Sequence, residues 1–254
     1  MATRKILDKE TINLAGQKNF KDLSVLSKFV KMERLYLDET AVEDLSPLVD
    51  CNQLKVLRLM GSSVRDISAV SNLTQLTELQ IQHTQVRDIS ALSALAELTW
   101  LRADYCEIRE IDSLAELEKL RRLEVSGCPI SNFSPLSALK SLVLLSLRHT
   151  EFENCELLTN NSEMANLNLG RTEITTINAL SSLTSLWCLS LQGTSVSDFS
   201  PHRTLSNLRE LSVGTYLSKN EYGSKDSIPI SDLGLDWKTY KSKDEITAFL
   251  KQYA

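Results

Sequence analysis

Apolar residues recur at fixed positions along this chain, and equivalent positions stand 22 residues apart. Leucine occupies the main position in most copies and methionine fills it in two: Leu54, Leu76, Leu98, Leu120, Leu142, Leu186, Leu208, Met32 and Met164. Further along each copy, apolar residues alternate with others, as in Leu57/Leu59 and Leu79/Ile81. Alternation over a short segment predicts a strand with one buried face. The period itself predicts a solenoid in which every copy forms one coil.

The predicted strands must run parallel, because each coil returns the chain to the same side. A small hydrogen-bonding residue follows each strand: Thr40, Ser62, Thr84, Cys106, Cys128, Thr150, Thr172 and Thr194. We expect these side chains to stack as a ladder and to bond to backbone carbonyls that the turns would otherwise bury unpaired.

A second recurring motif follows the ladder position in several copies. It reads DLSPL, DISAV, DISAL, NFSPL or DFSPH and begins at Asp44, Asp66, Asp88, Asn132 and Asp198. The serine of each motif is predicted to be a helix N-cap, followed in three copies by proline in the first helical position (Ser46, Ser68, Ser90, Ser134, Ser200; Pro47, Pro135, Pro201). Only about eight residues remain before the next strand, so this side of the coil has room for a short 3₁₀ turn.

These columns resemble the leucine-rich repeat family. The pattern L-x-x-L-x-L-x-x-T-x-V-x-D-[LI]-S-[PA]-L is similar to that of bacterial internalins and of the eukaryotic regulatory subunit of protein phosphatase 1, over roughly residues 32 to 215. The ladder departs from that class, which usually carries asparagine where this chain has Thr, Ser or Cys. The resemblance implies an α/β repeat solenoid, a right-handed horseshoe with a parallel concave sheet and a 3₁₀ convex side, used to bind proteins.

The two ends of the chain depart from the repeat. Residues 1–31 are expected to form a degenerate capping coil, in which Ile12 and Leu14 fall one residue early; residues 32–215 form the repeats. Residues 216–254 hold an inserted polar loop (216–229) and a cap with a terminal helix, which a capping box from Ser242 to Glu245 begins.

Charge and cysteine content narrow the class of partner. The net charge is −5 and the isoelectric point is about 5.4, which argues against a nucleic-acid partner. The chain has five cysteines, an odd number, and their positions follow the repeat rather than a paired disulfide framework. This favours a reducing compartment. No run of 18 apolar residues and no secretory leader is present in the chain as given. We therefore expect a cytoplasmic monomer without membrane insertion, or a secreted protein if a leader precedes this chain.

Catalytic and metal-binding motifs are absent from the sequence, so we expect no enzyme, no cofactor and no metal. His83 and His149 share a column but stand three coils apart, too far for one zinc ion. A calcium ladder on the aspartate column is disfavoured because Glu110, Asn132, Asn154 and Thr176 interrupt it. Cys106 and Cys128 are neighbours in the ladder, and we expect buried thiols rather than a disulfide.

The outward columns of the sheet are the candidate binding surface. Aromatic residues and arginines gather on the first six strands, and these residue types dominate interface energetics. The predicted patch consists of Tyr36, Arg58, Trp100, Arg102, Asp104, Tyr105, Arg122 and Arg148. Trp100 is the expected apolar anchor, and the arginines are expected to pair with carboxylates of the partner. The alternative is a merely solvated face, with Arg102 paired to Asp104 or Glu124 and Arg122 to Glu78 or Glu124.

The sequence thus predicts a non-catalytic scaffold that presents its concave surface to another protein. Two narrower forms stay open: a regulatory subunit that docks on an enzyme such as a phosphatase, and a bacterial adhesin that binds a host receptor. An enzyme would need a convergent cluster of titratable groups, which the outward columns do not show.

Overall fold

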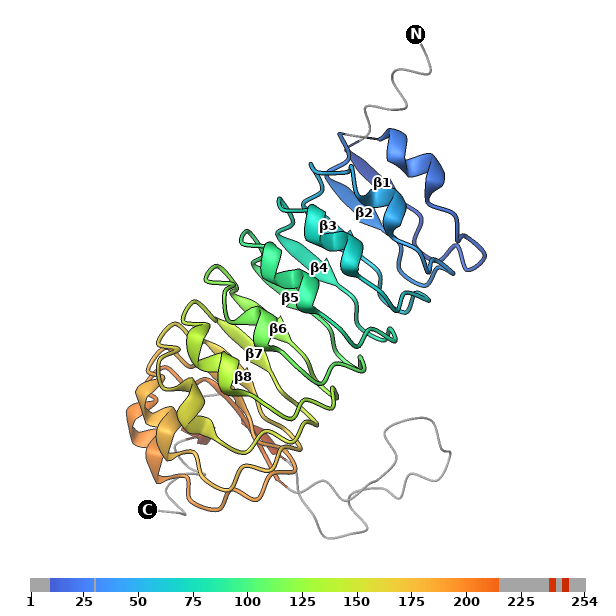
Figure 1. The fold of residues 1–254 in the computed structure, drawn as a ribbon. Coiled ribbons are helices and arrows are strands. Elements are labelled where there is room, and N and C mark those ends of the chain that lie inside the picture. The colour runs from blue at the N-terminus through green and yellow to red at the C-terminus, as the bar shows by residue number, and fades with distance from the viewer. Residues whose placement is uncertain (1–9, 30, 215–237, 241–243, 247–254) are drawn as a thin grey trace, which may run out of the picture. The chain divides into compact units, whose positions relative to one another are not determined.

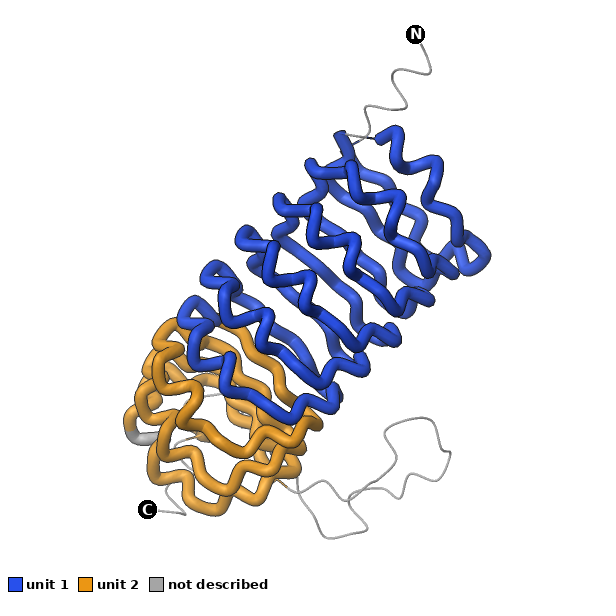
Figure 2. Tube along the Cα trace, in the orientation of Figure 1, with its two compact units in different colours: residues 1–142 blue, residues 143–254 orange. Residues whose placement is uncertain are grey.

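The computed structural model describes residues 10–29, 31–214, 238–240 and 244–246. The chain divides into two units, residues 1–142 and residues 143–254 (Figures 1 and 2). Each unit is a stack of coils with one short strand per coil, and short 3₁₀ helices lie between successive strands. The predicted boundaries at residues 31/32 and 215/216 stay a prediction.

Unit 1 contains six short strands that pair in chain order, all parallel. They are β1 (Thr11–Asn13), β2 (Arg34–Tyr36), β3 (Val56–Arg58), β4 (Glu78–Gln80), β5 (Trp100–Arg102) and β6 (Arg122–Glu124). From β2 onward each residue pairs with the residue 22 positions later, as Trp100 does with Arg122. Across β1 and β2 the offset is 23, because Thr11 pairs with Arg34. The first coil is therefore one residue longer, as the early positions of Ile12 and Leu14 predicted.

Short 3₁₀ helices form the other side of these coils. They are η1 (Ser24–Lys28), η2 (Ser46–Leu48), η3 (Ser68–Asn72), η4 (Ser90–Ala94), η5 (Asp112–Leu114) and η6 (Ser134–Ala138). The prediction that serine caps these helices is wrong. Where the motif occurs, serine is the first helical residue, and the side chain two positions earlier accepts its N–H: Asp88 accepts from Ser90 at 2.7 Å, and Asn132 takes the same role before Ser134. An ionised carboxylate is a stronger acceptor than a neutral hydroxyl because the bond is charge-assisted.

Unit 2 continues the pattern with three parallel pairings and one antiparallel strand. Its strands are β7 (Leu144–Ser146), β8 (Asn166–Asn168), β9 (Cys188–Ser190), β10 (Glu210–Val213) and β11 (Lys238–Tyr240), and its 3₁₀ helices are η7 (Cys155–Leu158), η8 (Asn178–Ser182) and η9 (Ser200–Thr204). The antiparallel pairing of β11 with β10 has no signal in the repeat. Loop 216–229 and most of the predicted terminal helix lie outside the described residues; residues 244–246 are helical.

The core of each unit is the stack of repeat leucines. Leu54, Leu57 and Leu59 have no exposed surface, and neither do their equivalents in the next coil, Leu76 and Leu79. Burying one such side chain stabilises the fold by roughly 1.5–3 kcal/mol. The inward positions are thus occupied by the scaffold, and only the outward positions of the strands are free to vary.

The ladder predicted from the sequence is confirmed at every position except Ser62, whose buried hydroxyl has no hydrogen-bond partner. Thr84 Oγ1 donates to the carbonyl of Ile81 in its own coil at 2.7 Å, and four other threonines bond in the same way (Thr40, Thr150, Thr172 and Thr194). The thiols of Cys106 and Cys128 reach back one coil instead, to the carbonyls of Ile81 and Ala103 at 3.1 Å each. Burial raises the pKa of the Cys128 thiol to about 12, so it stays protonated and able to donate.

Within the described part of the chain, no helix is both long enough and apolar enough to cross a membrane.

Candidate protein-binding face

The outward side chains of unit 1 form the candidate site, which we call the strand face. Outward and buried positions alternate along each strand, so β5 buries Leu101 and directs Trp100 and Arg102 outward. The 22-residue register then places Arg122 beside Trp100, and Glu124 beside Arg102. Side chains on neighbouring parallel strands are therefore close enough to interact.

Trp100 is held on two sides by residues of β6. The guanidinium carbon of Arg122 lies 5.2 Å from the Trp100 ring centroid, within the range of a cation–π contact. The indole Nε1–H of Trp100 donates to Glu124 Oε1 at 3.0 Å. Because both contacts restrain the indole, Trp100 presents its exposed part in one orientation.

Arg102 lies between two carboxylates. Its Nε is 3.0 Å from Asp104 Oδ2 and 3.4 Å from Glu124 Oε2. The other oxygen of Asp104 accepts the backbone N–H of Ser126 in the next coil at 2.9 Å. Asp104 is only 7% exposed, so this carboxylate is part of the framework that positions Arg102. We call Trp100, Arg102, Asp104, Arg122 and Glu124 the Trp100 cluster.

A smaller cluster, again of an aromatic ring, an arginine and an aspartate, lies on β2, β3 and the residues just after β2. Arg58 Nη2 is 2.7 Å from Asp38 Oδ2, and its guanidinium carbon is 5.3 Å from the Tyr36 ring centroid. Asp38 also accepts the backbone N–H of Met60 at 3.1 Å, as Asp104 does from Ser126. Asp38 and Asp104 occupy equivalent positions three coils apart. Each bonds to an arginine side chain and to a backbone N–H of the next coil.

Between the two clusters, β4 and the residues after it carry a chain of amides. Gln82 Nε2 donates to Gln80 Oε1 at 3.4 Å, and Gln80 Nε2 donates to Glu78 Oε1 at 2.7 Å. Since Glu78 can only accept when ionised, it fixes the direction of both bonds. Gln82 Oε1 is left buried and without a partner, and so is Arg58 Nε.

The turn column beside the strand face adds a stacked aromatic pair. The rings of His83 and Tyr105 lie 5.1 Å apart at an interplanar angle of 11°. Both residues have positive φ (58° and 56°), as does Gly127 one coil further (68°). The left-handed turn directs each side chain along the edge of the sheet, so Tyr105 extends the aromatic surface beyond the strands.

The structure brings the predicted site residues together in part. Of the eight, Trp100, Arg102, Asp104 and Arg122 meet in one cluster, Tyr36 and Arg58 in the other, and Tyr105 stacks on His83. Arg148 belongs to unit 2. The intramolecular pairing considered from the sequence is present for Arg102, whereas Arg122 stacks on Trp100 and, among the described residues, has no ion pair.

Glu124 and Asp38 were missing from the predicted patch. Each bonds to an arginine of the patch and holds it in place. A signal for Glu124 was available, because it stands 22 residues after Arg102 and so lies beside it in the parallel register. Asp38 pairs instead with a residue 20 positions later, which shows that bonding crosses columns as well as coils.

Metal ligation finds no support in the described residues, where no group of three or more His, Cys, Asp or Glu residues could hold an ion. All five cysteines are free thiols, and four of them are buried.

No family model matches the sequence, and no curated protein matches it. Solved structures do match. An internalin of Listeria monocytogenes, inlF, is 25% identical with a TM-score of 0.76, and the alignment covers 80% of this chain and 60% of that one. Internalin C2 of the same organism is 27% identical with a TM-score of 0.69, covering 74% and 83%. The functional domain of InlJ, described as including a cysteine ladder, shares the fold at 17% identity with a TM-score of 0.65, covering 83% and 50%.

These matches and the parallel, open sheet define the class: the chain is a leucine-rich repeat protein. Its 22-residue coils with 3₁₀ helices make it internalin-like in type. Folds of this class are in general scaffolds for protein interaction, because stacked coils form an extended surface.

Proposed function

We propose that this protein is a non-catalytic scaffold whose strand face binds a protein partner, with Trp100 as the anchor. The observation that carries the proposal is the restraint of half-buried Trp100 by Arg122 and Glu124 on the outward face of the sheet. Large aromatic residues and arginine contribute most of the free energy at protein interfaces. A surface that served only to be solvated would not need an ordered indole.

Preorganisation is the physical advantage of this arrangement. Fixing a flexible side chain at an interface costs roughly 0.5–1.5 kcal/mol, and Trp100 and Arg102 are already fixed by their neighbours. Arg58 and Arg102 are neutralised by carboxylates of the chain itself, which leaves Arg122 as the cation of the cluster with no ion pair among the described residues. We therefore expect the aromatic area of Trp100, Tyr36 and Tyr105 to contribute more to binding than arginine charge.

Affinity capture with purified variants tests the proposal. Trp100→Ala combined with Arg102→Ala is compared with wild type and with Trp187→Ala. Trp187 is 43% exposed and stands in unit 2 just before β9, so it is a tryptophan control outside the proposed site that is more exposed than half-buried Trp100. A partner held by wild type and Trp187→Ala but lost from the double variant supports the proposal. A partner that the folded double variant retains contradicts it.

A cytoplasmic location and a monomeric state belong to the same proposal. All five cysteines are free thiols, and two of them act as hydrogen-bond donors in the ladder. A reducing compartment preserves that role. Fractionation of source cells tests the location and sedimentation velocity tests the monomer; recovery outside the cell, or a stable dimer, contradicts the respective part.

A further inference from the structure

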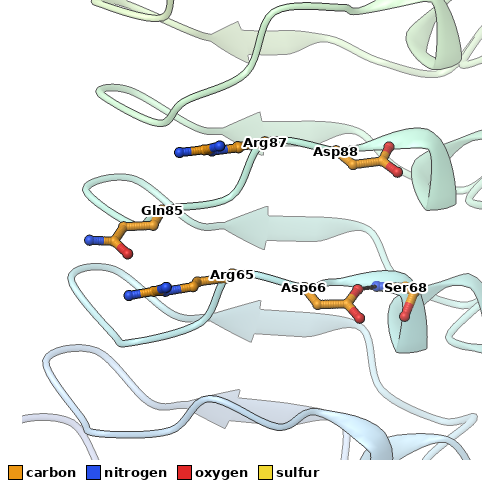
Figure 3. A pocket seen from close by; sticks show the side chains of 6 residues that line it. All are labelled: Arg65, Asp66, Ser68, Gln85, Arg87 and Asp88. Carbon is orange, nitrogen blue, oxygen red and sulfur yellow. Dashed lines mark hydrogen bonds between the residues drawn. The ribbon is translucent and has the colours of Figure 1, made fainter.

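A second surface lies at the side of the coils, between the strands and the 3₁₀ helices. Arg65, Arg87 and Arg109 occupy the same position in three successive coils of unit 1 and are all exposed. Arg65 and Arg87 border an open depression of about 620 Å³, which Asp66, Ser68, Gln85 and Asp88 also line (Figure 3). In Figure 3 the side chains of Arg65, Gln85 and Arg87 extend toward the same side.

Arg87 shows what an arginine at this position binds. Its Nε and Nη2 lie 2.6 and 2.5 Å from Glu107 Oε2, in the next coil. A guanidinium fork that reaches one carboxylate through two nitrogens makes a strong and directional contact. The coil geometry therefore already supports a carboxylate beside this column.

Arg65 has the same position in its coil but lacks that carboxylate. The residue that corresponds to Glu107 is Gln85, 20 positions after Arg65, and its side chain is neutral. For Arg109 the corresponding residue is Pro129. In the part of the chain that the structure describes, neither Arg65 nor Arg109 has an ion pair.

The two aspartates of the depression are committed elsewhere. Asp66 Oδ1 accepts the N–H of Ser68, and Asp88 Oδ1 accepts the N–H of Ser90, each at 2.7 Å. In Figure 3 their carboxylates point toward the 3₁₀ helices, away from the ends of the arginine side chains. Their charge weakens an incoming anion's attraction without occupying the place beside Arg65.

We propose that Arg65 and Gln85 form a carboxylate-binding site for an acidic segment of a partner protein. A glutamate or aspartate of the partner takes the place beside Arg65 that Glu107 takes beside Arg87, and the Gln85 amide N–H donates to the same carboxylate. This site lies outside the strand face, so it provides a second contact region. The proposal for it can be tested separately from the proposed role of the Trp100 cluster.

The repeat supplies variants with opposite expected effects. Hexaglutamate is the probe, and amide chemical shifts of the full chain report both its affinity and the place where it binds. Arg65→Gln removes the fork, and Gln85→Glu fills the site with an internal carboxylate; each is expected to abolish the shifts around residues 63–68 and 85–88. Glu107→Gln releases Arg87 and is expected to raise the affinity by about three- to fivefold, the effect of one exposed ion pair.

Glu151→Gln is the matched control. Glu151 is exposed and equivalent to Glu107 in the repeat, but Ser131 stands where the arginine would be. Glu151→Gln changes the net charge by the same amount as Glu107→Gln does, and it is expected to leave the hexaglutamate affinity unchanged. Hexaglutamate affinity that Arg65→Gln or Gln85→Glu does not lower overturns the proposal. So do equal gains from both glutamate variants, which would mean a diffuse charge effect, and binding of inorganic phosphate without binding of hexaglutamate.

Discussion

Gly127 leaves open the space that the ring of Tyr105 occupies: a Cβ atom on Gly127 would overlap ring atoms of Tyr105 in the preceding coil. The φ angle of Gly127 is +68°, the left-handed conformation shared by its column. Other residues of that column, such as His83 and Tyr105 itself, carry side chains. Gly127 is therefore required by its neighbour's ring as well as by its own backbone.

We predict that Gly127→Ala lowers the free energy of unfolding by about 2–4 kcal/mol, from steric overlap added to left-handed strain. Gly61→Ala is the control: the nearest atom is 3.8 Å away, so only the backbone cost of about 1 kcal/mol applies. Urea unfolding measures both. In a Tyr105→Ala background the two substitutions should cost the same; a persistent difference would mean that the ring is not the cause.

The hydroxyl of Ser62 is the weak point of the ladder. It is buried without a hydrogen-bond partner, whereas the equivalent Thr84 donates to the carbonyl three residues before it. We predict that Ser62→Thr raises the free energy of unfolding by about 1 kcal/mol, because the β-methyl favours the rotamer that makes this bond. The reverse change, Thr84→Ser, should lower it by a similar amount. A loss of stability in Ser62→Thr would show that this rung has no room for the methyl group.

Acid stability depends on the aspartate column. The N–H and hydroxyl groups of Ser46, Ser90 and Ser200 lower the pKa values of Asp44, Asp88 and Asp198. The unfolded chain, with aspartate pKa values near 3.9, then binds more protons than the folded protein. The stability that these ionised carboxylates contribute is fully present above the unfolded pKa. It is lost as the pH falls through the lowered pKa values of the folded protein.

The matching experiment replaces the three aspartates with asparagine. Asn132 already accepts the N–H of Ser134 at 3.0 Å, so the amide preserves the bond without the titration. We expect the triple variant to lose less stability than wild type between pH 5 and pH 3, measured by thermal unfolding across that range. If thermal stability falls equally with pH in the two proteins, these carboxylates do not contribute to the acid destabilisation.

Glu124 connects Trp100 with Arg102, and its charge matters more than its shape. We predict that Glu124→Gln keeps an acceptor for the Trp100 indole but weakens the hold on Arg102, which lowers partner affinity by about two- to fivefold. Folding should change little. Surface plasmon resonance against the captured partner measures the affinity. An increase in affinity would mean that the partner competes with Glu124 for Arg102.

The thiols should be unreactive in the folded protein. Desolvation raises the pKa of Cys155 to about 12 and that of Cys188 to about 11, so almost no thiolate forms at pH 8. Reaction with a disulfide reagent such as DTNB should be slow until urea unfolds the chain, and the half-buried Cys188 should react first. Rapid labelling of Cys128 in native protein would contradict its buried place in the ladder.

Much of the strand face could be read from the 22-residue period. The period placed Trp100 beside Arg122 and Arg102 beside Glu124, because parallel pairing preserves the register of the sequence. It could not show that Arg58 pairs with Asp38 or that Arg102 bonds to two carboxylates, since long side chains choose partners by rotamer. The serine caps were assigned wrongly for a related reason: the pattern marks the helix start, but not which side chain accepts the hydrogen bond.

The sequence by itself determined the solenoid, its parallel strands, the hydrogen-bonding ladder and the outward columns, because each follows from a residue pattern repeated at one spacing. Tertiary structure decided which outward residues contact one another, which carboxylates neutralise which arginines, and that Arg87 pairs with Glu107 in the next coil. Repetition fixes where the backbone of each coil lies relative to the next. The contacts of the side chains depend on reach, charge and available space, which vary from coil to coil.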